Sequence, residues 1–497
     1  MMVSTLPAIT IEIAGERLDP AAARKITFIS VRQVLSQPSV ADITFMNPPE
    51  SFLEGVDTKS QTSLSIICDG ALLFSGIYSA IEFSCKSSGD ELVHIRSFDR
   101  LYLMRKQQHI RSHSNVSSAN LIGEIANKYG LTINTPVQGP HWPHILQYHQ
   151  SDLDFITAVS QKAGLYFRLH ESTLDLFTYE ADQEGNVLTR GVNLLECTCE
   201  YNGARSYRTV NTSGWNPFLI SCHQAKARSH SEQLSGLDGD ADSLTVSHAT
   251  LYGDDHAMFL SEALTSRSTN MALALTGTAD GDPRLRPGET VIIEGVRSLI
   301  KGSYMLTEVN HVITPDTGYI SRFSTVLPEP CETETGPTAI LGKVISVDDP
   351  QKLGRVKVSL PASADIDTEW LNVLLPAGGS KKGLIALPDV DDNVLVLLLN
   401  HDPSFGIVLG GLFGAEKETP GWGVEGGQIR QYQLTTKGGQ KIKLNDAVGS
   451  IEISDSNGSF FGMNPDKMTI HSDKDLFIQA PGKKITIKAN AIDFEKE

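Results

Sequence analysis

A short apolar repeat in the last part of the chain places the strongest constraint on how this sequence can fold. Pairs of apolar residues separated by one residue recur every 7 to 10 residues. They are Ile442/Leu444, Ile451/Ile453, Phe461/Met463, Met468/Ile470, Leu476/Ile478, Ile485/Ile487 and Ile492/Phe494. Alternation puts both members of a pair on one face of a strand. The repeat therefore predicts a ladder of short strands with one apolar face.

One copy of such a ladder would leave its apolar face and its strand edges in water, which soluble proteins avoid. Three copies wound together would bury the faces on a common axis, so we expect an intertwined trimeric β-helix, or β-prism, over residues 430–497. About seven strands per face at a spacing of roughly 4.7 Å give a needle of roughly 33 Å. The predicted trimer core is Ile442, Leu444, Ile451, Ile453, Met468, Ile470, Leu476, Ile478, Ile485, Ile487, Ile492 and Phe494. A small single-chain sheet or solenoid is the alternative, because a repeat period does not fix the number of chains.

The region 337–415 carries a second pattern, in which short β-branched runs are separated by Gly, Pro and Asp. This pattern indicates a small barrel of five or six strands, and it fits an oligonucleotide/oligosaccharide-binding (OB) fold. The expected strands are Val344–Val347, Gly354–Val358, Trp370–Leu375, Leu384–Leu387, Asn393–Leu399 and Gly406–Leu412.

The same region carries a family resemblance over about 75 residues. The segments "GKVISVDDPQKLGRVKVSLP" and "EWLNVLLPAGGSKKGLIALPDVDDNVLVLLLNHDPSFGIVLGGLFG" resemble the barrel of VgrG-like spike proteins of contractile injection systems. These systems include phage tails, type VI secretion and extracellular injection machines. The resemblance implies a structural part and no enzyme. The chain would be an adaptor between the inner tube and baseplate and a membrane-piercing needle that delivers effectors on sheath contraction.

Residues 1–330 are expected to form the tail-hub half of such a spike, with two β-barrel-like domains and a helical insertion at about 115–165. Ser117 or Ser118 and, in the second helix, Ser151 are candidate N-caps, and Gly130 and Gly164 are candidate terminators. The wording "SDLDFI…AGLYF" resembles the helical insertion of the family. Two barrels per chain in a trimer would place six around one axis, matching a hexameric tube.

The resemblance also implies partners. They are two further copies of the chain in a homotrimer, an inner tube protein, baseplate proteins, effectors, the target membrane on firing and a PAAR-type tip protein. We expect the tip protein to dock on Ala491, Ile492, Asp493 and Phe494, because the blunt end of a prism would expose its last apolar layer. The alternative is that Glu495, Lys496 and Glu497 keep this end soluble without a cap.

Charge and motif content narrow the function further. The 42 basic and 59 acidic residues give a net charge of −17, which argues against a surface that grips nucleic acid or anionic lipid. The N-terminus lacks a signal-peptide pattern and no run of about 18 apolar residues occurs, so we expect cytoplasmic assembly before incorporation into the particle. Hydrolase, zincin, P-loop and dinucleotide motifs are absent, and no cofactor is expected. An envelope protein that binds or hydrolyses glycan or peptidoglycan through the barrel is the alternative function.

Several side chains are candidate metal ligands, although a structural role is favoured for each. His109, His113, His141, His144 and His149 form the densest histidine cluster, with His109 and His113 spaced to share a helix face, but the Pro-rich sequence around the last three favours a loop. Cys197 and Cys199 would share one face of a strand, and six cysteines are too sparse for a disulfide framework. Asp238, Asp240 and Asp242 begin a calcium-loop pattern that Ser243 and Ala249 break.

Two acidic pairs are candidates for acid–base chemistry, and one basic pair is a candidate phosphate site. Asp348/Asp349 and Asp391/Asp392 fall in predicted turns, where we expect solvated carboxylates, and Lys381–Lys382 is expected to be a solvated loop.

Overall fold

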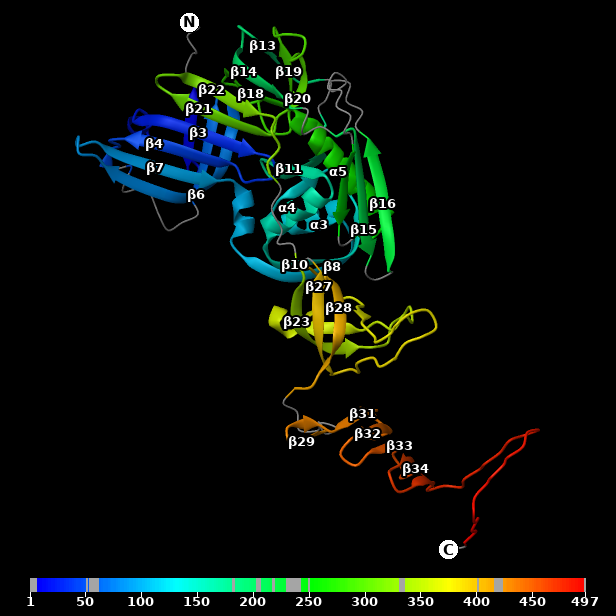
Figure 1. Cartoon of the computed structure of the whole chain (residues 1–497). Coiled ribbons are helices and arrows are strands. Elements are labelled where there is room, and N and C mark those ends of the chain that lie inside the picture. Colours follow the sequence, from blue (N-terminus) through cyan, green and yellow to red (C-terminus); the bar gives the residue numbers. More distant parts are fainter. Residues whose placement is uncertain are drawn as a thin grey trace. The chain divides into compact units, whose positions relative to one another are not determined.

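The computed structural model describes residues 7–50, 52, 62–180, 184–202, 207–216, 220–228, 243–248, 251–329, 336–399, 402–414 and 423–495. The chain divides into two compact units, Met1–Leu412 and Phe413–Glu497. Both units consist mainly of β-strands, and the main helices lie in the first unit (Figure 1).

An 11-stranded sheet with the order β14-β18-β22-β21-β3-β4-β7-β6-β5-β1-β2 forms the largest part of the first unit. Its N-terminal strands are β1 (Ile9–Ile13), β2 (Glu16–Arg17), β3 (Ile26–Val34), β4 (Val40–Met46), β5 (Ser63–Cys68), β6 (Ala71–Cys85) and β7 (Glu91–Phe98). The others are β14 (Leu194–Tyr201), β18 (Leu273–Asp280), β21 (Glu308–Thr314) and β22 (Gly318–Ser324). A short helix α1 (Pro20–Ala23) follows β2, and a 3-10 helix (Arg100–Arg105) follows β7.

This sheet contributes to two separate apolar cores. Phe45, Ile43 and Ile66 lie in the first core, and Leu275, Val309 and Phe323 lie in the second, which also includes side chains from a small sheet. The small sheet consists of β13 (Asn186–Thr189), β19 (Thr290–Glu294) and β20 (Gly302–Met305). Antiparallel pairing of β3 with β21, for example Ile29 opposite Ile313, joins the two halves into one continuous sheet. Two β-domains were expected from the sequence, but this pairing between distant segments could not be read from it.

The helical part begins and ends at local signals that the sequence carries. Helix α3 (Ser118–Asn127) is capped by Ser117, whose Oγ accepts from the Asn120 amide at 3.3 Å. Helix α4 (Asp152–Lys162) is capped by Ser151, whose Oγ accepts from the Asp154 amide at 3.1 Å. Gly164 follows α4 with a φ of +68°, the left-handed conformation that glycine adopts without strain. Ser117, rather than Ser118, is therefore the first cap.

Nine further elements among the described residues complete this region, and several of them contact the two helices. They are β8 (Gln108–Ser117), β9 (Thr132–Asn134), β10 (His141–Ser151), β11 (Leu165–His170), β12 (Thr173–Thr178), β15 (Thr209–Asn216), β16 (Ser221–Arg228), β17 (Ser243–His248) and α5 (Asp254–Ala272). Helix α5 packs against β15 and β16.

The OB barrel closes around Val344, Val358, Leu371 and Val396, all fully or almost fully buried. Its strands are β23 (Thr338–Ser346), β24 (Lys357–Leu360), β25 (Ile366–Asp367), β26 (Asn372–Val373), β27 (Asn393–Leu399) and β28 (Asp402–Leu412), with a 3-10 turn at Pro361–Ser363. The expected strand at Leu384–Leu387 is wrong, because these described residues form an extended segment outside the sheet. Ile385 is 80% exposed, so the apolar alternation of this segment does not correspond to buried side chains in the single chain.

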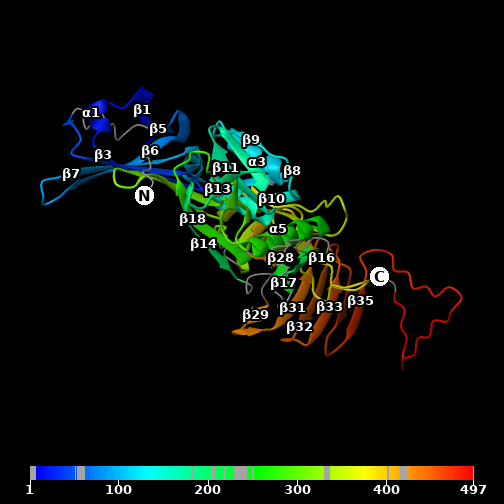
Figure 2. The same cartoon turned by 90° about the horizontal axis from the view of Figure 1, so that it is seen from above.

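The second unit contains a meander of five strands, with the order β31-β32-β33-β34-β35. These are β31 (Gln431–Thr435), β32 (Lys441–Asn445), β33 (Ser450–Ser454), β34 (Phe460–Met463) and β35 (Met468–His471), and they follow a small hairpin of β29 (Val424–Glu425) and β30 (Gln428–Ile429). Figure 2 shows the five strands side by side. Each pair of neighbours is antiparallel.

Candidate assembly surface

The register of the five-stranded meander places the apolar pairs of neighbouring strands opposite one another. Ile442 lies opposite Ile453, and Leu444 lies opposite Ile451. The pattern continues into β34 and β35, where Ile453 faces Phe461 and Phe461 faces Ile470. Directly opposed residues of an antiparallel pair project from the same face of a sheet. The apolar pairs of β32 to β35 therefore form one face, which we call the apolar ladder.

The apolar ladder is exposed in the single chain. The exposed fractions of Ile442, Leu444, Ile451, Ile453, Met468 and Ile470 lie between 39% and 59%. The other face of the sheet carries Lys443 opposite Glu452. A contiguous exposed apolar face backed by a polar one is typical of a surface that another chain covers.

Two residues extend the ladder beyond the predicted set. Tyr432 of β31 lies opposite Leu444, and Leu434 lies opposite Ile442. Both side chains are exposed. They have the same one-residue spacing as the other pairs, so the sequence carried the signal that would have included them.

The three last predicted pairs lie outside strands. Residues 472–495 are described without strand assignment, so a seven-strand ladder is not present in the single chain. The side chains concerned are nonetheless exposed: Leu476, Ile478, Ile485, Ile487, Ile492 and Phe494. A strand requires a partner for its backbone N–H and C=O groups, and the single chain provides none for this described segment.

The acidic turn at the start of the OB barrel differs from its expected state. Asp349 is buried, not solvated, and pairs with the buried Arg355. The hydrogen bond from this guanidinium holds the pKa of the Asp349 carboxyl well below its usual range. The second acidic pair does lie in an exposed turn, where Asp391 forms a surface ion pair with Lys343 at 2.9 Å. Lys381 and Lys382 are exposed, as expected.

The histidine cluster lies in two strands. The predicted helix for His109 and His113 and the predicted loop for His141, His144 and His149 are therefore both wrong. Strands β8 and β10 pair antiparallel, with His144 opposite Ser114 and Gln150 opposite His109. The ring of His144 is 3.1 Å from the Ser114 hydroxyl, and His109 lies 3.8 Å from Asp152. Among the described residues, no three His, Cys, Asp or Glu side chains gather in a way that could hold a metal ion.

The cysteines and the acidic loop are the remaining candidate metal ligands. Cys197 and Cys199 lie in β14, pack partly buried against the second core, and burial raises the pKa of the Cys199 thiol. The five described cysteines are free thiols. Cys331, Asp238, Asp240, Asp242 and Ala249 lie outside the described residues. Within the described part of the chain, no helix is both long and apolar enough to cross a membrane.

Two family models match parts of the chain. Residues 340–413 match the sequence model of the type VI secretion system/phage-baseplate injector OB domain. The sequence model of the Alg8 N-terminal domain matches residues 68–315.

Solved structures with a similar fold cover most of the chain. One is an Escherichia coli component of the type VI secretion system, described as structurally similar to the T4 bacteriophage tail proteins gp27 and gp5. It is 14% identical, the match covers 81% of this chain and 99% of that chain, and the TM-score is 0.53. A chain of the lidded Francisella PdpA–VgrG complex is 10% identical, with coverages of 93% and 80% and a TM-score of 0.58. The 43 kDa tail protein of prophage MuSo2 from Shewanella oneidensis is 11% identical, with coverages of 64% and 98% and a TM-score of 0.51.

These likenesses define the class of the protein by its fold. It is a mainly β protein whose fold resembles the folds of these phage tail and type VI secretion system proteins. Its barrel matches the injector OB-domain model, and the fold of the chain is similar to that of a chain in the PdpA–VgrG complex.

Proposed function

We propose that this chain is the central spike of a contractile injection machine and acts as a homotrimer. The main evidence for the trimer is the apolar ladder, whose large side chains are exposed in the single chain. Leaving such a face in water is unfavourable, and burying it against equivalent faces is the simplest remedy. The likeness to VgrG-containing and phage tail structures supports this assignment over an ordinary single-chain sheet.

Three copies fit this surface for a geometric reason. Each copy presents one apolar face, so three faces arranged around an axis all point inward and enclose a common core. The neighbouring chains would also provide pairing partners for residues 472–495, which form no strand in the single chain. In this proposal the intertwined needle includes Ile478, Ile487 and Ile492 in addition to the residues of β32 to β35.

The role of the assembled spike is mechanical. The hub half, residues 1–330, would adapt the trimer to the inner tube and the baseplate, and the needle would pierce the target membrane and deliver effectors on sheath contraction. A PAAR-type tip protein would close the needle at Ala491 to Phe494. Assembly would take place in the cytoplasm, before the spike becomes part of the particle. Binding to nucleic acid is not part of this role, in keeping with the net charge of −17.

Light scattering on the purified full-length chain tests the trimer directly. The expected mass is about three times the 54.0 kDa of one chain. A monomer whose C-terminal repeat is ordered, as judged by protease resistance of residues 430–497, would overturn the trimer. Binding or hydrolysis of purified peptidoglycan by the same preparation would instead support the envelope function.

A further inference from the structure

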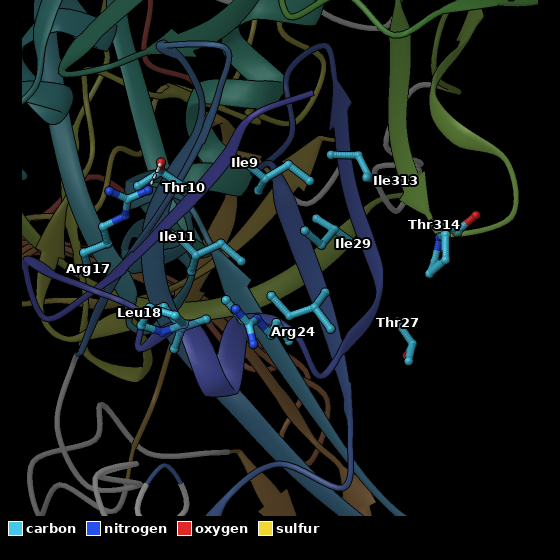
Figure 3. Close-up of a pocket in the computed structure, with 14 residues that line it drawn as sticks. Ile9, Thr10, Ile11, Arg17, Leu18, Arg24, Thr27, Ile29, Ile313 and Thr314 are labelled. Carbon is cyan, nitrogen blue, oxygen red and sulfur yellow. Dashed lines mark hydrogen bonds between the residues drawn. The ribbon is translucent and has the colours of Figure 1, made fainter. Parts of the chain in front are cut away.

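An apolar cavity lies in the N-terminal half of the large sheet, between β1, β3, the end of β21 and helix α1. Its volume is about 740 Å³. Figure 3 shows isoleucine side chains from β1, β3 and β21 around it. The apolar lining consists mainly of Ile9, Ile11, Leu18, Ile26, Ile29 and Ile313. Sites for small molecules are typically mostly apolar and measure roughly 300–1,000 Å³.

The strand pairing explains why the sheet stays open here. Along Ile9 to Ile11, β1 pairs with β5 on one side, and its pairing with β2 on the other side starts at Glu12. Strand β3 pairs with β21 from Ile29 onward, and Pro315 after β21 has no N–H to continue that ladder. Within the described residues, β1 and β3 therefore flank the cavity without pairing with each other. Of the apolar lining, Ile9, Leu18 and Ile26 are half-buried, whereas Ile11, Ile29 and Ile313 are at most 4% exposed.

Two arginines lie among the residues that line the cavity. Arg17 and Arg24 are both exposed, and in the described part of the chain neither forms an ion pair. Arg17 Nη2 donates to Thr10 Oγ1 at 3.5 Å, which keeps it beside β1. The nearby carboxylate of Asp19 is occupied in capping α1, because it accepts from the amides of Ala21 and Ala22. Two cations that form no ion pair with a described carboxylate, beside an apolar cavity, favour a ligand with an anionic head and an apolar body.

We propose that this cavity binds a fatty acid, with its carboxylate at Arg17 and Arg24 and its acyl chain among the isoleucines. A carboxylate offers both guanidinium groups a charge-assisted hydrogen bond, and an acyl chain has no polar group that would remain unpaired beside the half-buried Ile9, Leu18 and Ile26. The site is separate from the apolar ladder, and the inference does not depend on the proposed spike function.

Binding of dodecanoate to the full-length protein, followed by isothermal titration calorimetry, tests the site. We expect saturable binding of one dodecanoate per chain and roughly tenfold weaker binding of dodecanol, which lacks the charge. The double variant Arg17→Ala/Arg24→Ala should weaken dodecanoate binding by about tenfold and leave dodecanol binding unchanged. Arg297→Ala, an exposed arginine away from the cavity lining, is the matched control and should bind as the wild type does.

A second variant separates loss of the site from loss of the fold. Ala23 lines the cavity from exposed helix α1, so Ala23→Trp should fill it and abolish binding of both ligands while the circular dichroism spectrum is retained. Absence of saturable dodecanoate binding to the wild type would overturn the proposal. Equal affinity for dodecanoate and dodecanol, or unaltered binding by the arginine variant, would show that Arg17 and Arg24 do not bind the carboxylate. Binding to phosphatidylglycerol vesicles without dodecanoate binding would also contradict it and indicate a membrane surface.

Discussion

Asp349 and Arg355 form a two-pronged ion pair at the turn that precedes β24. Arg355 Nη2 donates to Asp349 Oδ1 at 2.7 Å, and its Nε donates to Oδ2 at 3.0 Å. The side chains are only 3% and 8% exposed. The same carboxylate accepts from the amides of Gln351 at 3.0 Å and Leu353 at 2.8 Å. One carboxylate therefore organises the whole turn.

Removing the guanidinium should destabilise the barrel measurably. Arg355→Ala leaves a buried carboxylate without its charged donor, and we expect a loss of roughly 2 kcal/mol, seen as a lower melting temperature in differential scanning calorimetry. Lys343→Ala is the matched control, because its partner is also an aspartate, Asp391, but the two side chains are 49% and 78% exposed. Its effect should be small. An equal loss in both variants would contradict the assigned importance of burial.

His311 should make the stability of the first unit depend on pH. Its ring is fully buried, with Nε2 at 3.0 Å from the Leu285 carbonyl and Nδ1 at 3.0 Å from the Ser321 hydroxyl. Burial lowers its pKa from 6.5 to about 4. Because the unfolded chain binds this proton near pH 6.5 and the folded chain does not, the stabilisation is complete above that pH. It is lost as pH falls through about 4, by an amount of order 3 kcal/mol.

The corresponding measurement compares the unfolding free energy of the wild type and of His311→Gln at pH 7 and pH 5. Glutamine does not titrate in this range, so the difference between the two proteins should shrink as the pH falls. His471→Gln, at an exposed position of β35, is the control for removal of a histidine as such. Parallel pH profiles for the wild type and His311→Gln would show that His311 is not the group responsible.

Local patterns in the sequence predicted much of this fold, because their physical causes are local. A serine before an amphipathic stretch caps it wherever it lies, so Ser117 and Ser151 begin helices as expected. Burial and long-range pairing are not local. The turn at Asp349 was predicted, but its burial against Arg355 was not, and the strand pairing of β8 with β10 brings together segments that the sequence separates.

In the candidate assembly surface, too, the local pattern was predictable and the long-range contacts were not. Alternation predicted that Ile442 and Ile453 share a face, and the register confirms it. The number of chains that cover this face depends on copies that no single-chain pattern specifies. Leu384–Leu387 illustrates the limit. Its alternation predicts a strand, but among the described residues no strand pairs with it, although the Leu384 amide donates to the Pro376 carbonyl at 3.0 Å.

A charge placed in the apolar ladder should prevent trimer assembly. Ile453, which is 49% exposed in the single chain, would lie on the axis of the trimer. Ile453→Asp would bring three carboxylates together there, and an unpaired buried charge costs several kcal/mol or forces protonation. Light scattering should then report monomers. Glu452→Gln, one residue away on the opposite face, should leave the trimer unchanged.

The same type of substitution tests residues 472–495, which form no strand in the single chain. Ile478→Asp and Ile487→Asp should also prevent or weaken assembly if this segment joins the needle in the trimer, because both side chains are exposed in the single chain and would then be buried on the axis. Trimers of unchanged thermal stability in these two variants would show that Ile478 and Ile487 point outward and that the proposed register is wrong there.

The last prediction concerns the docking of a tip protein. Phe494 is 92% exposed and Ile492 is 50% exposed, with Asp493 between them, so three copies would present a compact apolar surface ringed by carboxylates. A PAAR-type protein that covers this surface would bury all three phenylalanines. Deleting 491–497 should abolish co-purification of the tip protein while the spike remains trimeric by light scattering. Deleting only residues 495–497 removes three charged residues but keeps Ile492 and Phe494, and it should leave the tip protein bound. If the tip protein still co-purifies after the longer deletion, it docks elsewhere, and if the trimer dissociates, Ile492 and Phe494 belong to the needle core instead.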